Sequence, residues 1–495
     1  MRVALIMPPL TSAGPGSNSA FRFLHDLARG RPFWNPWIYP LVRRFGLVDF
    51  DFYPSNLVQL GTMLASTHQV RIFNFLLRDL EADVLAWRPE VLGFACPGGG
   101  NLLWIERKAK AWKARLRAAV VLGGVHVGLD PERSLLTTCA DVVCRGEVDL
   151  VLPQVLDHLA GRNAAMPAEG VCYRRDGSVV LTPPAQVGDL GQLPVPKHEL
   201  VDLAEYRSIG IEFSRGCPHL CDFCYLSGFE RRVVWRYRPV ARILEEIDHL
   251  AGMVPQGAAT RLYFLDANVG GQEERLQDLL TGLIASRRKF PFWTGTTVGV
   301  SDKTLALLAE AGCSFLYTGL ETGSVRQLAA IPKLGKLSRV ERFIEAAADH
   351  GLSVSFNLML LQPGETRADL AETLTLCRRL ALRGRRGLGR RMGVSFYPHL
   401  FRPVPGTPLL ARLVKDGWRP PSDFTAWGRF YEDLANGRLG GANFTADVRA
   451  KDLHQALSTL FLLNLGQVLG PGLSARILTG AAHALAARST SALGS

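Results

Sequence analysis

The chain has 495 residues, 47% of them hydrophobic and 21% charged, with 57 Lys and Arg against 45 Asp and Glu for a net charge of +12. This composition excludes disorder and fibrous repetition, and the length predicts a globular protein of about two to four domains. Nine cysteines are too few for a disulfide scaffold, and their odd number favours a reducing, cytoplasmic compartment. The most apolar late segment, 457–473, is too short and too polar to span a bilayer, so we expect no transmembrane segment.

From residue 2 to about residue 160, short apolar runs alternate with helical patterns. Strands that are apolar throughout belong to parallel sheets covered on both faces, so we expect a doubly wound, Rossmann-like α/β domain. Ligands bind such sheets at the carboxyl ends of the strands. Turn-forming, mostly glycine-rich segments follow the predicted strands there, at 7–10, 96–100, 123–126 and 145–147.

Two features interrupt this pattern. Residues 11–52 form a long insertion rich in glycine and aromatic residues, and loops of that length are often functional. Residues 170–181 predict a β-hairpin with Asp176-Gly177 as its turn, and a proline-rich connector follows at 193–196. We therefore expect a first domain over 1–160 and a hairpin with linker over 161–205.

A second strand–helix series occupies residues 206–410. Its apolar strands are predicted at 209–213, 261–265, 292–298, 315–320, 354–360 and 393–397. Six parallel strands with intervening helices indicate a (βα)6-type partial TIM barrel, with its chemistry at the carboxyl ends of the strands. Residues 411–495 are expected to form a mainly helical C-terminal domain.

Seven arginines and no acidic residue lie between Arg378 and Arg391, interleaved with glycines. This run holds more than half of the positive excess, but it lacks the aromatic residues and the periodicity of a nucleic-acid surface. We interpret it as a solvated loop, with a site for an anionic substrate or partner as the alternative, and we expect no nucleic-acid partner.

Cys217, Cys221 and Cys224 follow the first strand of the second series directly. Three thiolates so close together suit an Fe–S cluster or zinc, and three ligands leave one coordination position open for chemistry. Zinc with His219 as fourth ligand and a purely structural or regulatory thiol cluster are the alternatives. The other cysteines are expected to be buried small hydrophobes, at 96, 139, 144, 172, 313 and 377.

The Cx3Cx2C loop with an aromatic residue before its last cysteine resembles the signature of radical S-adenosylmethionine (SAM) enzymes. Further segments resemble that family, at 264–268, 319–324, 361–366 and 405–408. The turns at 121–126 and 143–147 are similar to the cobalamin-binding domain that precedes the radical domain in the B12-dependent branch. There are two departures from the family pattern. Residues 266–268 read Asp-Ala-Asn where Asp-Asp is common. The Asp-x-His-x-x-Gly motif is absent, so His126 is not expected to be a cobalt ligand.

The resemblance implies three cofactors and the residues that hold them. Cys217, Cys221 and Cys224 would hold a 4Fe-4S cluster that binds and cleaves SAM. The implied SAM contacts are Phe223, through nearby backbone, Asp266, Glu321 and Ser324. The implied cobalamin contacts are Pro9, Leu10, Gly98, Gly123, Gly124, His126, Gly146 and Glu147. Ordinary structural roles are the alternatives for Glu321, Ser324 and His126; the catalytic residues are not assigned.

The resemblance implies a cobalamin-dependent radical SAM methyltransferase that acts on a non-activated carbon of a small molecule: a natural product, a lipid or a tetrapyrrole. Radical rearrangement, cyclisation or oxidation with the same cofactors is one alternative, and a non-catalytic metal-binding protein is another. An electron donor of the flavodoxin or ferredoxin type is also expected.

Replacing Cys217, Cys221 and Cys224 by Ala is expected to abolish the brown colour of the protein, because the cluster loses its ligands. Iron content and the visible spectrum measure this loss. An unchanged iron content in the variant would contradict the assignment of the cluster to this loop.

Overall fold

The fold was analysed in a computed structural model. It describes residues 1–10, 12, 53–163, 165–206, 208–219, 221–229, 234–254, 260–286, 290–329, 331, 337–388, 393–436, 438, 444–445 and 447–468. These residues form two compact units. The first unit consists of the described residues up to Thr260 together with those of 402–441, and the second consists of 261–401 and the described residues from Phe444 onward.

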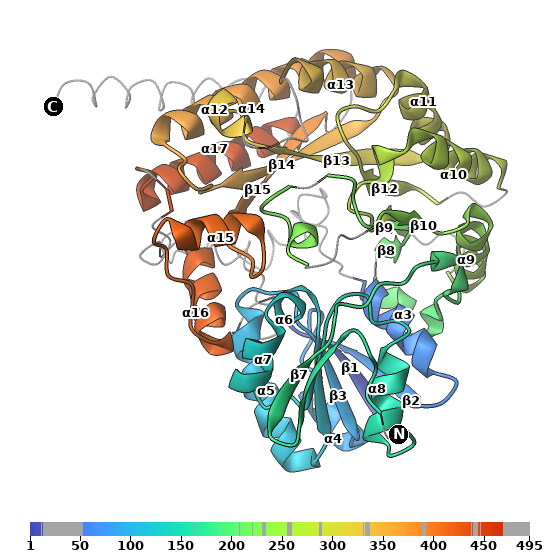
Figure 1. The fold of residues 1–495 in the computed structure, drawn as a ribbon. Helices are drawn as coiled ribbons and strands as arrows, with labels where there is room; N and C mark the ends of the chain where they lie inside the picture. Colours follow the sequence, from blue (N-terminus) through green and yellow to red (C-terminus); the bar gives the residue numbers. More distant parts are fainter. Residues whose placement is uncertain are drawn as a thin grey trace. The chain divides into compact units, whose positions relative to one another are not determined.

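The first unit contains a seven-stranded sheet in the order β2-β1-β3-β4-β5-β6-β7 (Figure 1). Its strands are β1 (Arg2–Met7), β2 (Gln69–Asn74), β3 (Val91–Ala95), β4 (Ala119–Gly123), β5 (Val142–Cys144), β6 (Val171–Arg175) and β7 (Ser178–Leu181). The first five are parallel, and the β6–β7 hairpin adds to the edge in antiparallel fashion. The doubly wound sheet and the hairpin are therefore confirmed.

Helices cover both faces of this sheet, as its apolar strands require. One face packs against α3 (Ser55–Leu64) and α8 (Leu152–Leu159), and the other against α4 (Glu81–Trp87), α5 (Asn101–Leu116) and α7 (Pro131–Thr137). Alternation along β1 shows the division, since Val3 and Leu5 belong to the core under α3 whereas Ala4 and Ile6 belong to the core under α5.

The first unit also contains elements from later in the chain. These are β8 (Ser208–Ile211), β9 (Ser214–Arg215), β10 (Arg236–Tyr237), α9 (Val240–Met253), α15 (Pro408–Lys415) and α16 (Phe424–Ala435). β9 pairs with β10 in antiparallel fashion, and α16 packs against α5 and α7. A segment expected in a separate helical domain thus completes a core of the N-terminal sheet.

The second unit is a parallel strand–helix series. Its strands are β11 (Arg261–Phe264), β12 (Phe292–Gly295), β13 (Cys313–Glu321), β14 (Ser353–Leu360) and β15 (Val394–Leu400), paired in chain order. The helices are α10 (Glu273–Ala285), α11 (Asp302–Glu310), α13 (Leu337–Asp349), α14 (Arg367–Leu388) and α17 (Ala450–Val468). This is the strand–helix repetition that the sequence predicts for a barrel-type domain.

The loop predicted for the arginine run is wrong over most of its length, because α14 continues to Leu388. Arg379 and Arg383 of that helix form ion pairs with Glu341 and Glu345 of α13. The insertion at 11–52, apart from Ser12, and the tail beyond residue 468 lie outside the described residues. Within the described ranges, no helix combines the length and apolar character that a bilayer crossing requires.

Gly146 makes a close backbone contact with Ala185 in the first unit. Its φ is +80°, and a Cβ there would lie 2.2 Å from the Ala185 carbonyl oxygen. Gly177 in the hairpin has φ +81° with nothing near its Cβ position. We expect Gly146→Ala to lower the free energy of unfolding by about 3 kcal/mol and Gly177→Ala by about 1 kcal/mol, because only the first adds a backbone clash to the conformational strain. Urea unfolding measures both, and equal losses would contradict the packing described.

Candidate functional site

The three-cysteine loop begins where the β9–β10 ladder opens. Gly216, which separates Arg215 from Cys217, has φ +92°, and a Cβ there would lie 2.6 Å from the Val234 carbonyl oxygen. Only glycine combines this backbone conformation with so close an approach. The loop therefore leaves the ladder along a fixed path.

Hydrogen bonds to backbone carbonyls shape the loop itself. The Cys224 N–H donates to the Cys221 carbonyl at 3.0 Å, and the Ser227 hydroxyl donates to the carbonyls of Cys221 and Cys224 at 2.9 and 2.7 Å. Cys221 is buried and the other two cysteines of the loop are half-buried. The described residues contain no preassembled three-ligand metal centre, so the fit of a 4Fe-4S cluster rests on this donor set.

The far side of the loop is held by the turn that precedes α15. The Leu409 N–H donates to the Asp222 carbonyl at 3.0 Å, and Arg412 forms an ion pair with the Asp222 carboxylate. A Cβ on Gly406 would lie 2.8 Å from the Gly228 carbonyl oxygen. The Pro-Gly-Thr-Pro segment at 405–408 therefore acts in this structure as a support for the cysteine loop.

The remaining cysteines behave as small hydrophobes, as predicted. Cys96, Cys144, Cys172, Cys313 and Cys377 are buried, and Cys139 is half-buried. Burial raises the pKa of Cys144 to about 12 and that of Cys313 to about 12, so both thiols stay protonated and unreactive near neutral pH.

The predicted cobalamin contacts at the ends of β1, β3 and β4 meet at one edge of the N-terminal sheet, because parallel strands end on the same side. Gly124 has φ +119°, and a Cβ there would lie 2.8 Å from the Cys96 carbonyl oxygen. Gly98 has φ +91° beside the His126 ring. The Cβ positions of Gly98, Gly123 and Gly124 lie next to atoms of His126, Cys144 and Cys96. Pro9 and Leu10 follow β1 at the same edge, which is where parallel sheets bind ligands.

His126 lies behind this edge inside a cage of rings from α16. Its ring centroid is 6.0, 5.6 and 5.8 Å from those of Phe424, Trp427 and Tyr431, each edge to face. Burial lowers the pKa of His126 to about 3, and its Nε2 has no hydrogen-bond partner among the described residues. A buried nitrogen without a partner costs about 1–3 kcal/mol, so a polar group or water bound next to it would be stabilising.

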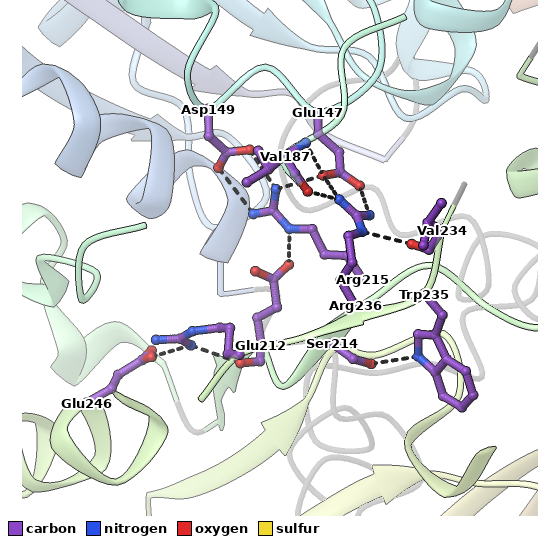
Figure 2. Close-up of polar contacts among 11 residues, drawn as sticks. Glu147, Asp149, Val187, Glu212, Ser214, Arg215, Val234, Trp235, Arg236 and Glu246 are labelled. Atoms are coloured by element: carbon purple, nitrogen blue, oxygen red, sulfur yellow. Dashed lines mark hydrogen bonds and ion pairs between the residues drawn. The ribbon is translucent and has the colours of Figure 1, made fainter. Parts of the chain in front are cut away.

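Gly146 and Glu147, also predicted as cobalamin contacts, have protein partners instead. The Glu147 N–H donates to the Ala185 carbonyl at 2.8 Å. The Glu147 carboxylate accepts two hydrogen bonds from the Arg236 guanidinium, at 2.5 and 2.9 Å, and one from the Val187 N–H at 3.0 Å (Figure 2). These contacts account for both residues without a ligand.

Two polar residues follow β11 in the second unit. Asp266 is 3% exposed. Burial of Tyr317 raises the pKa of that tyrosine, and the negative charge of Asp266 adds to the shift. Asn268 is 4% exposed, and neither atom of its side-chain amide has a hydrogen-bond partner within the described part of the chain. An amide buried without partners is the arrangement expected of a ligand contact, so this strand end fits a bound polar cofactor or substrate.

Glu321 and Ser324 follow β13. Glu321 has φ +62° next to an irregularity in the β13–β14 register, and a left-handed glutamate at a strand end is a strained conformation typical of functional sites. Ser324 caps α12 (Val325–Leu328), and its hydroxyl donates to Asp369 at 2.5 Å. Although burial favours the neutral acid, hydrogen bonds from Arg326, Ser324 and Thr366 lower the pKa of Asp369. Ser324 therefore has a structural role here.

Sequence reasoning missed several residues that the structure brings into these sites. Asn268 belongs to the 264–268 segment that resembles the radical SAM family, and its place two residues after Asp266 was the available signal. The α16 cage was signalled by aromatic residues at 424, 427 and 431, one face of a helix. Arg215 and Arg236, which join Glu147, had no signal beyond the position of Arg215 two residues before Cys217.

Comparisons with known proteins match two separate segments of the chain. Residues 45–156 match the B12 binding domain, and residues 211–377 match the radical SAM superfamily. A cobalamin-binding domain followed by a radical SAM domain is thus the class that the fold and the sites define. An uncharacterized methyltransferase of Pyrococcus horikoshii is 26% identical over 343 residues, which cover 66% of this chain and 73% of that protein.

Two further relatives are named for the reactions that they catalyse. The anaerobic magnesium-protoporphyrin IX monomethyl ester cyclase of Synechocystis is 37% identical over 223 residues, 43% of either chain. The hopanoid C-2 methylase of Rhodopseudomonas palustris is 25% identical over 287 residues, 57% of this chain and 50% of that protein. The chain thus spans half or less of the length of these two relatives.

Among solved structures, the radical SAM methyltransferase TsrM of Kitasatospora setae, with tryptophan substrate and a SAM analogue, has a TM-score of 0.66 and 16% identity. The match covers 95% of this chain and 91% of TsrM, and at this identity it shows the fold alone. The chain thus carries both domains of the B12-dependent radical SAM enzymes, and its relatives include methyltransferases. It is an enzyme whose cofactors are a 4Fe-4S cluster, SAM and cobalamin, which sets aside the non-catalytic alternative.

The His126 cage predicts a pH dependence of stability. As pH falls below about 6.5, the unfolded chain binds a proton on this ring, but the folded chain does not until its pKa of about 3. Between about pH 7.5 and pH 5.5 the free energy of unfolding should therefore fall by about 1.4 kcal/mol more in the wild type than in His126→Phe. Urea unfolding at both pH values measures this, with the exposed His249→Phe as control. Equal slopes for wild type and His126→Phe would contradict the buried, neutral ring.

Proposed function

We propose that this enzyme transfers a methyl group to a non-activated carbon of a small molecule: a natural product, a lipid or a tetrapyrrole. The observation that supports this most directly is that one chain carries a three-cysteine loop and a glycine-rich edge of a doubly wound sheet. A related hopanoid methylase and the TsrM fold point to methylation in particular. The two matched domains imply the cofactors, and the chain's own residues supply their sites.

We assign the cofactor sites by domain. Residues 1–160, completed by α16, bind cobalamin, 161–205 form the hairpin and linker, and 206–410 carry the cluster and SAM. When bound, the cluster and SAM supply hydrogen-atom abstraction and cobalamin supplies the methyl group. Cys217, Cys221 and Cys224 hold the cluster, while the glycines at 98, 123 and 124 give cobalamin close backbone contact.

SAM contacts are proposed in the cysteine loop and at the ends of β11 and β13. Backbone near Phe223 and the side chains of Asp266 and Glu321 are assigned to SAM, and Asn268 adds a buried amide able to donate and accept. Buried polar groups with fixed partners keep water out and hold a substrate in one orientation, which a radical reaction requires because water-exposed radicals react unselectively.

A second candidate function is cyclisation with the same cofactors. The cyclase of Synechocystis is 37% identical to this chain over 223 residues, the highest identity among the relatives described. Methylation and cyclisation differ in what becomes of the methyl group of SAM, so the products distinguish them. For either reaction we propose a one-electron donor of the flavodoxin or ferredoxin type and residence in the cytoplasm.

The test is anaerobic reconstitution with iron, sulfide and hydroxocobalamin, followed by reaction with methyl-deuterated SAM and a reductant. Methylation predicts that the protein retains cobalamin and that the deuterated methyl group appears on this cobalamin. It also predicts that S-adenosylhomocysteine and 5′-deoxyadenosine both form. The Cys217→Ala variant is the matched control: it should still retain cobalamin but form no 5′-deoxyadenosine.

Other outcomes contradict the proposal in identifiable ways. Formation of 5′-deoxyadenosine without S-adenosylhomocysteine would favour cyclisation or rearrangement over methylation. Loss of cobalamin on gel filtration of the wild type would overturn the assignment of residues 1–160.

A further inference from the structure

A buried ion cluster connects the N-terminal sheet with the base of the cysteine loop, all within the first unit. It consists of Arg215, Arg236, Glu147, Asp149 and Glu212 (Figure 2). The side chains of Arg215, Arg236 and Asp149 are 14%, 10% and 7% exposed, and those of Glu147 and Glu212 are 20% and 27% exposed. Two largely buried guanidinium groups thus face three carboxylates, of which Asp149 is the most buried.

The two arginines act as a pair because of strand geometry. Arg215 of β9 lies directly opposite Arg236 of β10 in the antiparallel ladder, so both side chains leave the same face. Arg236 contacts Glu147 through two hydrogen bonds, at 2.5 and 2.9 Å. Arg215 contacts Asp149 through two more, at 2.6 and 3.1 Å. Two planar, two-pronged contacts fix both the separation and the orientation of the surfaces they join.

Close backbone contacts fix both ends of the connection between the sheet and the cysteine loop. On one side, Gly146 is pressed against Ala185, and the Glu147 N–H is bonded to the Ala185 carbonyl. On the other side, Gly216 is pressed against Val234 immediately before Cys217. A shift of either arginine would therefore be passed to the cysteine loop instead of being absorbed by the backbone.

Glu212 completes the cluster from the strand side. Its carboxylate accepts a hydrogen bond from Arg215 Nε at 2.7 Å, so the Arg215 guanidinium has carboxylate partners on both sides. Burial raises the pKa of Glu212 while the charge of Arg215 opposes that shift. With three carboxylates around two guanidinium groups, every guanidinium has a charged partner, which a buried cation requires.

Stability alone is a weak reason for such a cluster. Buried ion pairs are often no more stabilising than apolar side chains of the same size, because removing charges from water offsets their attraction. What an apolar contact does not supply is directional registry. In an enzyme with two large cofactors, displacement of a reacting group by 1 Å can cost about a hundredfold in rate.

We propose that Arg215 and Glu147 are positioning residues that set the cysteine loop, and with it the cluster, at a fixed place relative to the cobalamin edge at 96–100 and 123–126. Glu147 thereby acts through Arg236 and Arg215 on the loop instead of contacting the corrin. The inference rests on the two cofactors of the proposed function but not on methyl transfer, and it holds equally for a cyclase.

The test compares the holoenzyme with Arg215→Lys and Glu147→Asp, both loaded with cluster and cobalamin. Lysine keeps the charge of Arg215 but loses its two-pronged contact, and aspartate keeps the charge of Glu147 but shortens its reach by one methylene group. Arg242→Lys, in an exposed ion pair with Glu245 on α9, is the matched control.

The readout is the power saturation of the cob(II)alamin EPR signal with the cluster oxidised and then reduced. A reduced cluster is paramagnetic and speeds the relaxation of a nearby cobalt spin, with a steep dependence on their separation. We expect wild type and Arg242→Lys to show the same relaxation enhancement. Arg215→Lys and Glu147→Asp are expected to show an altered enhancement while iron and cobalamin contents stay at wild-type levels.

Two results would overturn the inference while leaving the proposed function intact. One is a lower melting temperature in both variants with the wild-type relaxation enhancement, which would mean that the ion cluster contributes to stability only. The other is no enhancement in the wild type despite full loading. Failure of the wild type to retain cobalamin would instead overturn the proposed function and this inference together.

Discussion

The contact between Arg236 and Glu147 is the interaction on which the rest of the first unit depends. Their residues are 89 positions apart in the chain, and the pairing brings the end of the N-terminal sheet to the ladder that starts the cysteine loop. The glycines at 146 and 216 make that meeting possible because each permits a backbone approach that a side chain would block. Arg215 strengthens the same junction through its two hydrogen bonds to Asp149.

Periodicity and spacing carried the fold prediction a long way. The apolar runs at 3–7, 91–96 and 118–122 lie within one residue of the ends of β1, β3 and β4, because strands covered on both faces tolerate few polar residues. The cysteine spacing located the candidate cluster loop because its three cysteines lie within eight residues of sequence. Features that depend on local sequence were therefore the predictable ones.

The ion cluster and the His126 cage were not predictable, since their partners are far apart in sequence. Arg215 and Asp149 are separated by 66 residues, and His126 meets rings at 424–431. The arginine run failed for a different reason. Gly384 and Gly387 suggested a break, but an isolated glycine costs a helix only about 1 kcal/mol, and the surrounding Leu, Ala and Arg residues are strong helix formers.

The return of α16 to the N-terminal sheet has a consequence for the order in which the protein is made. Trp427 and Tyr431 belong to the same core as Ile6 and Phe94, so that core stays incomplete until more than four hundred residues have left the ribosome. Domains usually fold as they emerge during synthesis, but this one must wait while the intervening strand–helix series is being translated. The glycine-rich edge beside His126 is thus finished late, and the proposed cobalamin site would be complete only once the chain extends through α16.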